Sequence, residues 1–156
     1  MGWLVSADVA HKPRHHRCER LALNRHPSPE VMARLLRLGA GMTNQPTILR
    51  FRTYRLSLEI IEELRPVIAL LERRDGNLSK QLVRAATSVS LNLAESRGRR
   101  GRDRVRFLRI ALGSAEESLA CLHVAAAWGY LDAAQTESSA DQVAHLLAML
   151  GKMTRA

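Results

Sequence analysis

A seam of apolar residues, repeating at alternating steps of three and four, is the feature that most constrains this chain. Its members are Val105, Leu108, Leu112, Ala115, Leu119, Leu122 and Ala126. This spacing places all of them on one face of an α-helix, and it is the heptad pattern by which long helices pack together. We therefore predict a helix that is capped by Asp103 and runs to Trp128.

A second apolar strip lies beside this seam. It consists of Phe107, Ile110, Cys121, Val124 and Trp128. One apolar seam is enough to pack against a neighbouring helix. Two seams therefore predict that the helix is buried on two sides, with the second side against another subunit. Gly113-Ser114 interrupts the helix, where glycine costs about 1 kcal/mol relative to alanine, and this predicts close approach of another helix there.

Three other segments also have helical spacing. The first spans residues 53–74 and contains Pro66, where we predict a kink but not an end. A turn at residues 75–77 leads to the second, residues 78–96. Gly129 then ends the long helix, and Asp132 with Gln135 forms a capping box that opens the last one.

Composition agrees with this reading. Apolar residues make up 46% of the 156 residues and aromatic residues only 4%, and the abundant Ala and Leu have high helix propensity. Short connections between long helices imply antiparallel neighbours. The predicted fold is all-α, an antiparallel up-down-up-down four-helix bundle.

Residues 1–41 differ from the bundle, which we assign to residues 42–156. They form a basic extension that is expected to be poorly ordered or to reflect a mis-assigned start, apart from a short helix between Ser28 and Gly39. His11, His15, His16 and Cys18 lack the paired spacing of a zinc site, so no metal is expected. With neither a signal peptide nor a membrane span, we expect a cytoplasmic protein.

The formal net charge is +9, and seven arginines lie within residues 97–109. Arg102, Arg106 and Arg109 share one helix face, while Arg99 and Arg100 lie on the adjoining loop, residues 97–102. Guanidinium groups suit phosphate bidentately, so the cluster favours nucleic-acid binding. The alternative is a solvated bundle end, partly neutralised by Glu95 and Asp103.

Other chemistry finds little support in the sequence. The only aromatic residue near the arginines is Phe107, which we expect to face the core, so recognition of backbone and shape is favoured over base stacking. Asn92 and Glu95 are interpreted as inter-helix hydrogen-bonding residues, and Glu117 as a partner of Arg84 or Arg109. We find no nucleophile with a base, no phosphate loop and no metal spacing, so neither enzymatic activity nor a cofactor is expected.

Several motifs in fixed order resemble one bacterial family. They are RAATSVSLNLAE (residues 84–95), the basic loop, ALGSAEE (residues 111–117) and GYL (residues 129–131). Together they are similar to a four-helix-bundle family that includes proteins encoded by 23S rRNA intervening sequences and accessory proteins of diversity-generating retroelements. The resemblance covers residues 53–155; Ser96 stands where that family usually has glycine.

This resemblance implies a bundle that assembles into a ring oligomer, typically a homopentamer. In the retroelement members it also implies a basic surface for nucleic acid and a reverse transcriptase partner. It matches Arg84 and Asn92 to architectural positions. Our first hypothesis is a non-enzymatic oligomeric accessory protein that binds structured RNA or an RNA–DNA hybrid. The contacts assigned to nucleic acid are Arg84, Arg97, Arg99, Arg100, Arg102, Arg106 and Arg109. The alternative is a homo-oligomeric protein-interaction scaffold with no nucleic-acid role.

Overall fold

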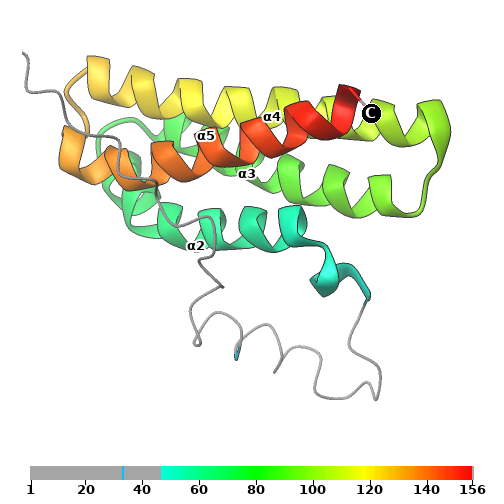
Figure 1. Ribbon diagram of the computed structural model, residues 1–156. Coiled ribbons are helices and arrows are strands. Elements are labelled where there is room, and N and C mark those ends of the chain that lie inside the picture. Colours follow the sequence, from blue (N-terminus) through cyan, green and yellow to red (C-terminus); the bar gives the residue numbers. More distant parts are fainter. Residues whose placement is uncertain (1–32, 34–46, 156) are drawn as a thin grey trace, which may run out of the picture.

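The computed structural model describes Ala33 and residues 47–155, and within them the chain is helical almost throughout. A 3-10 helix η1 (Thr47–Arg50) precedes four α-helices: α2 (Arg52–Glu72), α3 (Gly76–Arg97), α4 (Gly101–Ala127) and α5 (Ala133–Arg155). They run alternately up and down side by side (Figure 1). The predicted all-α antiparallel four-helix bundle is confirmed. The predicted extension lies outside the described residues except for Ala33, which falls in its predicted short helix. The four residues considered for a metal also lie outside them.

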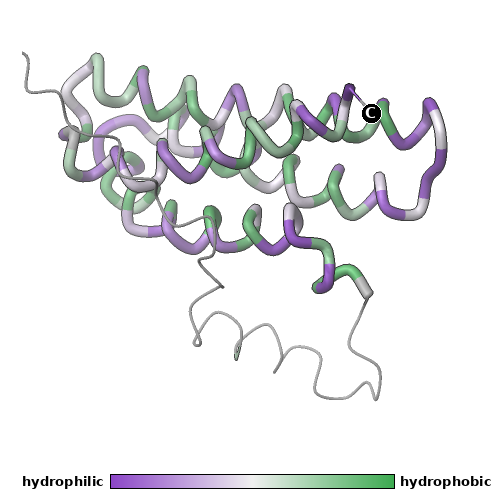
Figure 2. Tube along the Cα trace, in the orientation of Figure 1, coloured by the Kyte–Doolittle hydropathy of each residue, from purple (hydrophilic) through white to green (hydrophobic). Residues whose placement is uncertain are grey.

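The four helices close around one leucine-rich core. Each packs on the next in sequence, and α2 also contacts α5. Apolar residues alternate with polar ones along every helix, as expected when one face of each is buried (Figure 2). The leucines with essentially no exposed surface are Leu64, Leu71, Leu82, Leu93, Leu108, Leu122, Leu146 and Leu150.

The buried face of α4 is rotated from the predicted seam. Leu108, Ala115 and Leu122 are buried as predicted, but Ala126 is exposed and Val105, Leu112 and Leu119 are only partly covered. Ala111, Ser118 and Ala125 are buried in their place. Small side chains let a neighbouring helix approach closely, so the fully covered face is the one that carries them.

Close packing of α3 and α4 depends on serine rather than on Gly113. The hydroxyls of Ser88 and Ser114 lie 2.8 Å apart across the two helices. Gly113 points away from the rest of the chain, and a Cβ there would meet nothing within 4 Å. The close helix approach predicted at Gly113-Ser114 is therefore made by Ser114, and Gly113 takes no part in it among the described residues.

The ends of the helices follow local capping rules. Asp75, predicted to lie in a turn, caps α3 by accepting hydrogen bonds from the backbone N–H groups of Asn77 (2.9 Å) and Leu78 (3.0 Å). Gly129 follows the end of α4 with a φ of 67°, a left-handed conformation that favours glycine. The Asp132–Gln135 capping box is confirmed by two reciprocal 2.8 Å hydrogen bonds. The α2 helix continues through Pro66.

Candidate nucleic-acid interface

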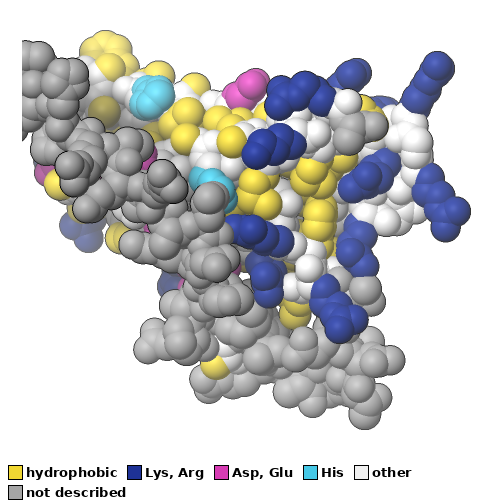
Figure 3. Space-filling view, in the orientation of Figure 1, with side chains coloured by type: hydrophobic (Ala, Val, Ile, Leu, Met, Phe, Trp, Pro, Cys, Tyr) yellow, Lys and Arg dark blue, Asp and Glu magenta, His cyan; other side chains and the backbone are white. Residues whose placement is uncertain are grey.

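The antiparallel topology gathers six of the seven predicted arginines at one end of the bundle. Arg97 is the last residue of α3, Arg99 and Arg100 lie in the following loop, and the others are on the first turns of α4. All of their side chains are exposed. Lysine and arginine side chains crowd the right-hand end of the molecule in Figure 3.

The loop between α3 and α4 is shorter than predicted. Only residues 98–100 separate the two helices, and α4 begins at Gly101, whose φ of 54° turns the chain into the helix. The predicted N-cap Asp103 lies within the first turn, and the residue at the N-cap position, Arg100, makes no capping hydrogen bond through its side chain. Arg102 is therefore a helix residue, not a loop residue.

Arg84 lies apart from this group. It precedes Arg97 on α3 by thirteen residues, which is about 20 Å along the helix. Its guanidinium donates to the side-chain oxygen of Gln81, whose amide nitrogen donates to Glu117. The predicted pairing of Glu117 with Arg84 is thus indirect, through Gln81. The structure does not bring Arg84 together with the loop arginines.

Five further cations join the same end and were missed in the sequence. They are Arg50, Arg52 and Arg55 before and within the start of α2, and Lys152 and Arg155 at the end of α5. The two helix ends meet where the Thr53 hydroxyl donates to the Met153 sulfur at 3.5 Å. The up-down topology was the available signal, since it places the starts of α2 and α4 beside the ends of α3 and α5.

Arg104 was also left out of the predicted contacts, although it lies on α4 among them. We call the whole group the basic end: Arg50, Arg52, Arg55, Arg97, Arg99, Arg100, Arg102, Arg104, Arg106, Arg109, Lys152 and Arg155.

Arg99 differs from its neighbours because its charge is compensated. Its guanidinium bonds to Glu95, with Nε 3.0 Å from the carboxylate, and lies 3.5 Å from the carboxylate of Asp103. The hydrogen bond and charge of Glu95, together with the charge of Asp103, raise the pKa of Arg99. These contacts bridge the end of α3, the loop and the start of α4, so Arg99 fastens the loop.

Phe107 was predicted to face the core, and this prediction was wrong. The ring is half-buried and lies between two arginines. The Arg99 guanidinium carbon lies 5.5 Å from the centre of the ring, and that of Arg106 lies 6.0 Å from it. Both distances are within the range of cation–π attraction. The ring therefore lies between Arg99, which is paired with two acids, and Arg106, which is not.

The other arginines of α3, the loop and α4 lack acidic partners. Within residues 47–155, no carboxylate forms an ion pair with Arg97, Arg100, Arg102, Arg104 or Arg109. Glu95 and Asp103, the two acids that were expected to neutralise the cluster, both pair with Arg99. The rest of the cluster keeps its charge available for an anion.

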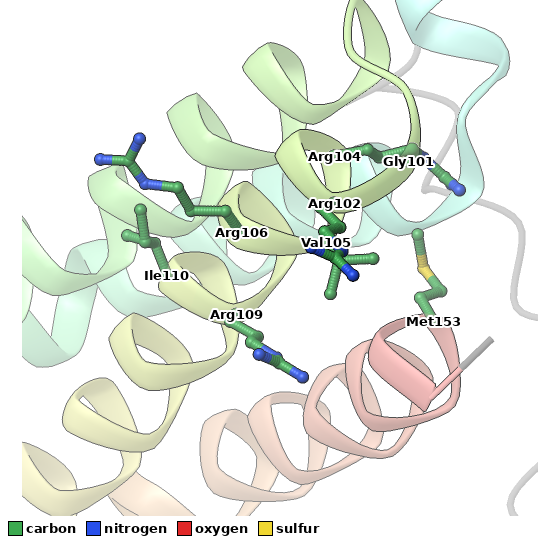
Figure 4. Close-up of a pocket in the computed structure, with 8 residues that line it drawn as sticks. All are labelled: Gly101, Arg102, Arg104, Val105, Arg106, Arg109, Ile110 and Met153. Atoms are coloured by element: carbon green, nitrogen blue, oxygen red, sulfur yellow. The ribbon is translucent and has the colours of Figure 1, made fainter.

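A groove of about 970 Å³ runs between the start of α4 and the end of α5. Its lining comprises Gly101, Arg102, Arg104, Val105, Arg106, Arg109, Ile110 and Met153. Arg102, Val105 and Arg109 extend into the space between the two helices, and Met153 faces them from α5 (Figure 4). Arg106 and Ile110 lie on the far side of α4 in this view. The groove combines cationic walls with an apolar floor.

Asn92 and Glu95 do not make the inter-helix hydrogen bonds that were predicted. Asn92 donates to the backbone oxygen (2.8 Å) and the hydroxyl (3.1 Å) of Ser88, one turn earlier on α3. Ser88 in turn contacts Ser114 of α4, so Asn92 supports that contact indirectly. Glu95 is engaged by Arg99 of the loop.

The outer face of α3 and α4 exposes apolar side chains. Ile110 (41% exposed), Val124 (42%) and Trp128 (70%) recur along one face of α4, and Leu91 of α3 is 64% exposed. The antiparallel register set by Ser88 and Ser114 places Leu91 level with the first of these. Of the predicted second strip, Cys121 alone is buried, at 4% exposure, and burial raises the pKa of its thiol.

Other kinds of site are not evident in the part of the chain that the structure describes. No three His, Cys, Asp or Glu side chains there gather as metal ligands would. None of its helices has the length and apolar character that crossing a membrane requires.

Fold and surface together define a four-helix bundle with an arginine-rich end. The chain belongs to the 23S rRNA-intervening sequence protein family, whose model matches residues 50–152. The predicted family is thereby confirmed.

A solved structure has the same fold. It is a protein of unknown function from the S23 ribosomal protein family of Bacteroides thetaiotaomicron, 23% identical, with a TM-score of 0.60. The similarity covers 67% of this chain and 99% of that one. At this identity it supports the fold alone. No curated protein matches the chain.

Proposed function

We propose that this protein is a non-enzymatic RNA-binding protein that holds structured RNA, or an RNA–DNA hybrid, at its basic end. The observation that carries the proposal is a set of six arginines, gathered at one end of the bundle, that have no carboxylate partner among the described residues. They are Arg97, Arg100, Arg102, Arg104, Arg106 and Arg109. Membership of a family named for an intervening sequence of 23S rRNA makes RNA the favoured anion.

The arrangement suits a phosphate backbone. Arg102 and Arg109 are seven residues apart on α4, which is about 10 Å along the helix, with Arg106 between them. Guanidinium groups bind phosphate oxygens through two parallel N–H donors. Four or five such contacts give a slope of log K against log salt of roughly −4 for a duplex.

We also propose that copies of this chain associate through the outer face of α3 and α4. Ile110, Val124, Trp128 and Leu91 would then be buried, which accounts for apolar side chains that a monomer leaves in water. The family resemblance implies a homopentamer. A ring would repeat the basic end, and repeated weak sites on one RNA add by avidity.

A protein-interaction scaffold is the second candidate, favoured by Trp128, which is 70% exposed and stacks on Tyr130 with ring centres 6.3 Å apart. In that case the arginines would contact an acidic protein, and the family resemblance makes a reverse transcriptase one partner to examine. This candidate predicts no salt-dependent RNA binding.

The test is fluorescence anisotropy of a labelled structured RNA between about 50 and about 300 mM salt. One variant replaces Arg100, Arg102, Arg106 and Arg109 with glutamine. The matched control replaces Arg65, Arg73, Arg74 and Lys80 with glutamine; these residues lie on α2, in the turn after it and on the first turns of α3, away from the basic end. Light scattering would give the oligomer mass of each protein.

We expect the basic-end variant to bind much more weakly, with a salt slope shallower by about 3 to 4, and the control to change little. Equal affinities of the two variants would exclude the basic end as the RNA site. If the wild type fails to bind RNA and the basic-end variant loses its oligomer mass, the scaffold is the better account.

A further inference from the structure

The groove between α4 and α5 is lined by apolar side chains as well as arginines, and the phosphate backbone of a duplex would use only the arginines. We propose that it binds a single unpaired nucleotide, with the phosphate held by Arg102 and Arg109 and the base against Val105 and Met153. The inference rests on the proposed function and adds a specificity: the RNA is recognised where a base is free of the stack.

The cationic walls call for an anion. Arg102 and Arg109 extend into the groove from one face of α4 (Figure 4). No carboxylate among residues 47–155 pairs with either of them. A phosphate that enters between them meets two donor groups whose charge is not already compensated, which is the condition for a strong contact.

The apolar floor would contact an apolar group of the ligand, which a phosphate does not supply. Val105 and Met153, which face the space between the two helices, are half-buried. Phosphates and riboses on the outside of a duplex are hydrated and would leave these side chains in contact with water. The face of a base is flat and apolar, and a methionine thioether adapts its shape and contacts rings favourably. Arginine side chains also stack on unpaired bases.

A paired base within a duplex cannot occupy the groove. Within a stem, both faces of each base are covered by its neighbours, so only a bulge, a loop or a strand end offers a free face. An acidic peptide with apolar side chains would match the same charges and floor, but the name of the family, which refers to an intervening sequence of 23S rRNA, favours a nucleotide. The peptide is one outcome of the test.

The first experiment reports on Met153 directly. Protein with ¹³C-labelled methionine methyl groups would be titrated with adenosine monophosphate, ribose 5-phosphate and inorganic phosphate at low salt. We expect the first alone to shift the Met153 methyl resonance, through the ring current of the base. Met149, one turn earlier on α5, is the internal control. Replacement of Arg102 and Arg109 by glutamine should abolish the shift.

The second experiment separates a free nucleotide from an RNA. Two hairpins that are identical except for one bulged nucleotide would be compared by anisotropy. The wild type should bind the bulged RNA about tenfold tighter, a preference of about 1.4 kcal/mol. Met153→Gln keeps the length and charge of the side chain and should lose the preference while keeping the salt slope and the melting temperature.

Each outcome decides the inference. Equal affinity for the two hairpins, with no shift from the nucleotide, overturns it and leaves the proposed function intact. Equal shifts from all three ligands show a groove that reads charge alone, which also overturns it. A nucleotide shift without any RNA binding supports the nucleotide site but removes the proposed function. A shift with a Glu-Leu peptide and not with the nucleotide assigns the groove to a protein and overturns the inference.

Discussion

Two arginines of the basic end that lie over the same aromatic ring should contribute to RNA binding in different ways. Arg99 and Arg106 lie 5.5 and 6.0 Å from the centre of Phe107. Arg99 is paired with Glu95 and Asp103, whereas Arg106 has no acidic partner among the residues described. Replacing either with glutamine removes one positive charge from the protein, so a reading based on net charge predicts the same effect for both.

The structure predicts different salt slopes. A cation that neutralises a phosphate of a duplex contributes about 0.9 to the slope of log K against log salt. Arg106→Gln should therefore make the slope shallower by about 0.9. Arg99→Gln should leave it nearly unchanged, because Glu95 and Asp103 already occupy this guanidinium. Arg99→Gln should still weaken RNA binding. The loop loses its contacts to both helices, and the carboxylates of Glu95 and Asp103 are left unpaired beside the RNA.

The assay is anisotropy at five salt concentrations for the wild type and both variants. The combination of Glu95→Gln with Asp103→Asn is the complementary control, since it frees Arg99 and should steepen the slope by about 0.9. If Arg99→Gln makes the slope as shallow as Arg106→Gln does, the compensated-charge reasoning is wrong.

Three further predictions concern stability, each measured by thermal and urea unfolding. Gly113→Ala should stabilise the bundle by about 1 kcal/mol, because its Cβ meets no atom of the chain; a loss would reveal packing against another copy. Asp132→Ala should cost about 1 kcal/mol by removing the capping box, and an unchanged midpoint would contradict that role. Burial, opposed by Arg55 and aided by Glu63, raises the pKa of Glu59 above 4.5. The folded state then holds this proton more tightly than the unfolded chain does. The free energy of unfolding therefore falls as the pH rises from about 4.5 to the pKa of the folded state. Glu59→Gln should raise the melting temperature at pH 7 and not at about pH 4; an equal gain at both would exclude the titration.

Most of the fold follows from patterns that are local in the sequence. The spacing of Leu64, Leu71, Leu82 and Leu93 predicts amphipathic helices and their core faces, because helical periodicity acts within a few turns. The Asp132 capping box and the stop at Gly129 are equally local. Short connections then leave few arrangements other than an antiparallel bundle.

Predictions failed where two faces of one helix were nearly equivalent. The sequence of α4 carries overlapping apolar strips, and the choice of Ala111, Ser118 and Ala125 over Ala126 depended on how closely α3 could approach. The same choice turned Gly113 outward and placed Ser114 at the helix contact. Phe107 moved from an expected core position to one between two guanidiniums for the same reason.

For the candidate site, the sequence by itself determined that a dense arginine cluster follows α3 and continues onto the next helix. The structure turns Arg102 and Arg109 toward α5 and Arg106 to the far side of α4. Only the tertiary structure decided which charges remain available, because Glu95 and Asp103 both meet Arg99 once the loop is closed. It also decided that cations from the start of α2 and the end of α5 join them. Ion pairs and surface patches depend on proximity in space between residues distant in sequence, and local periodicity carries no information on that proximity.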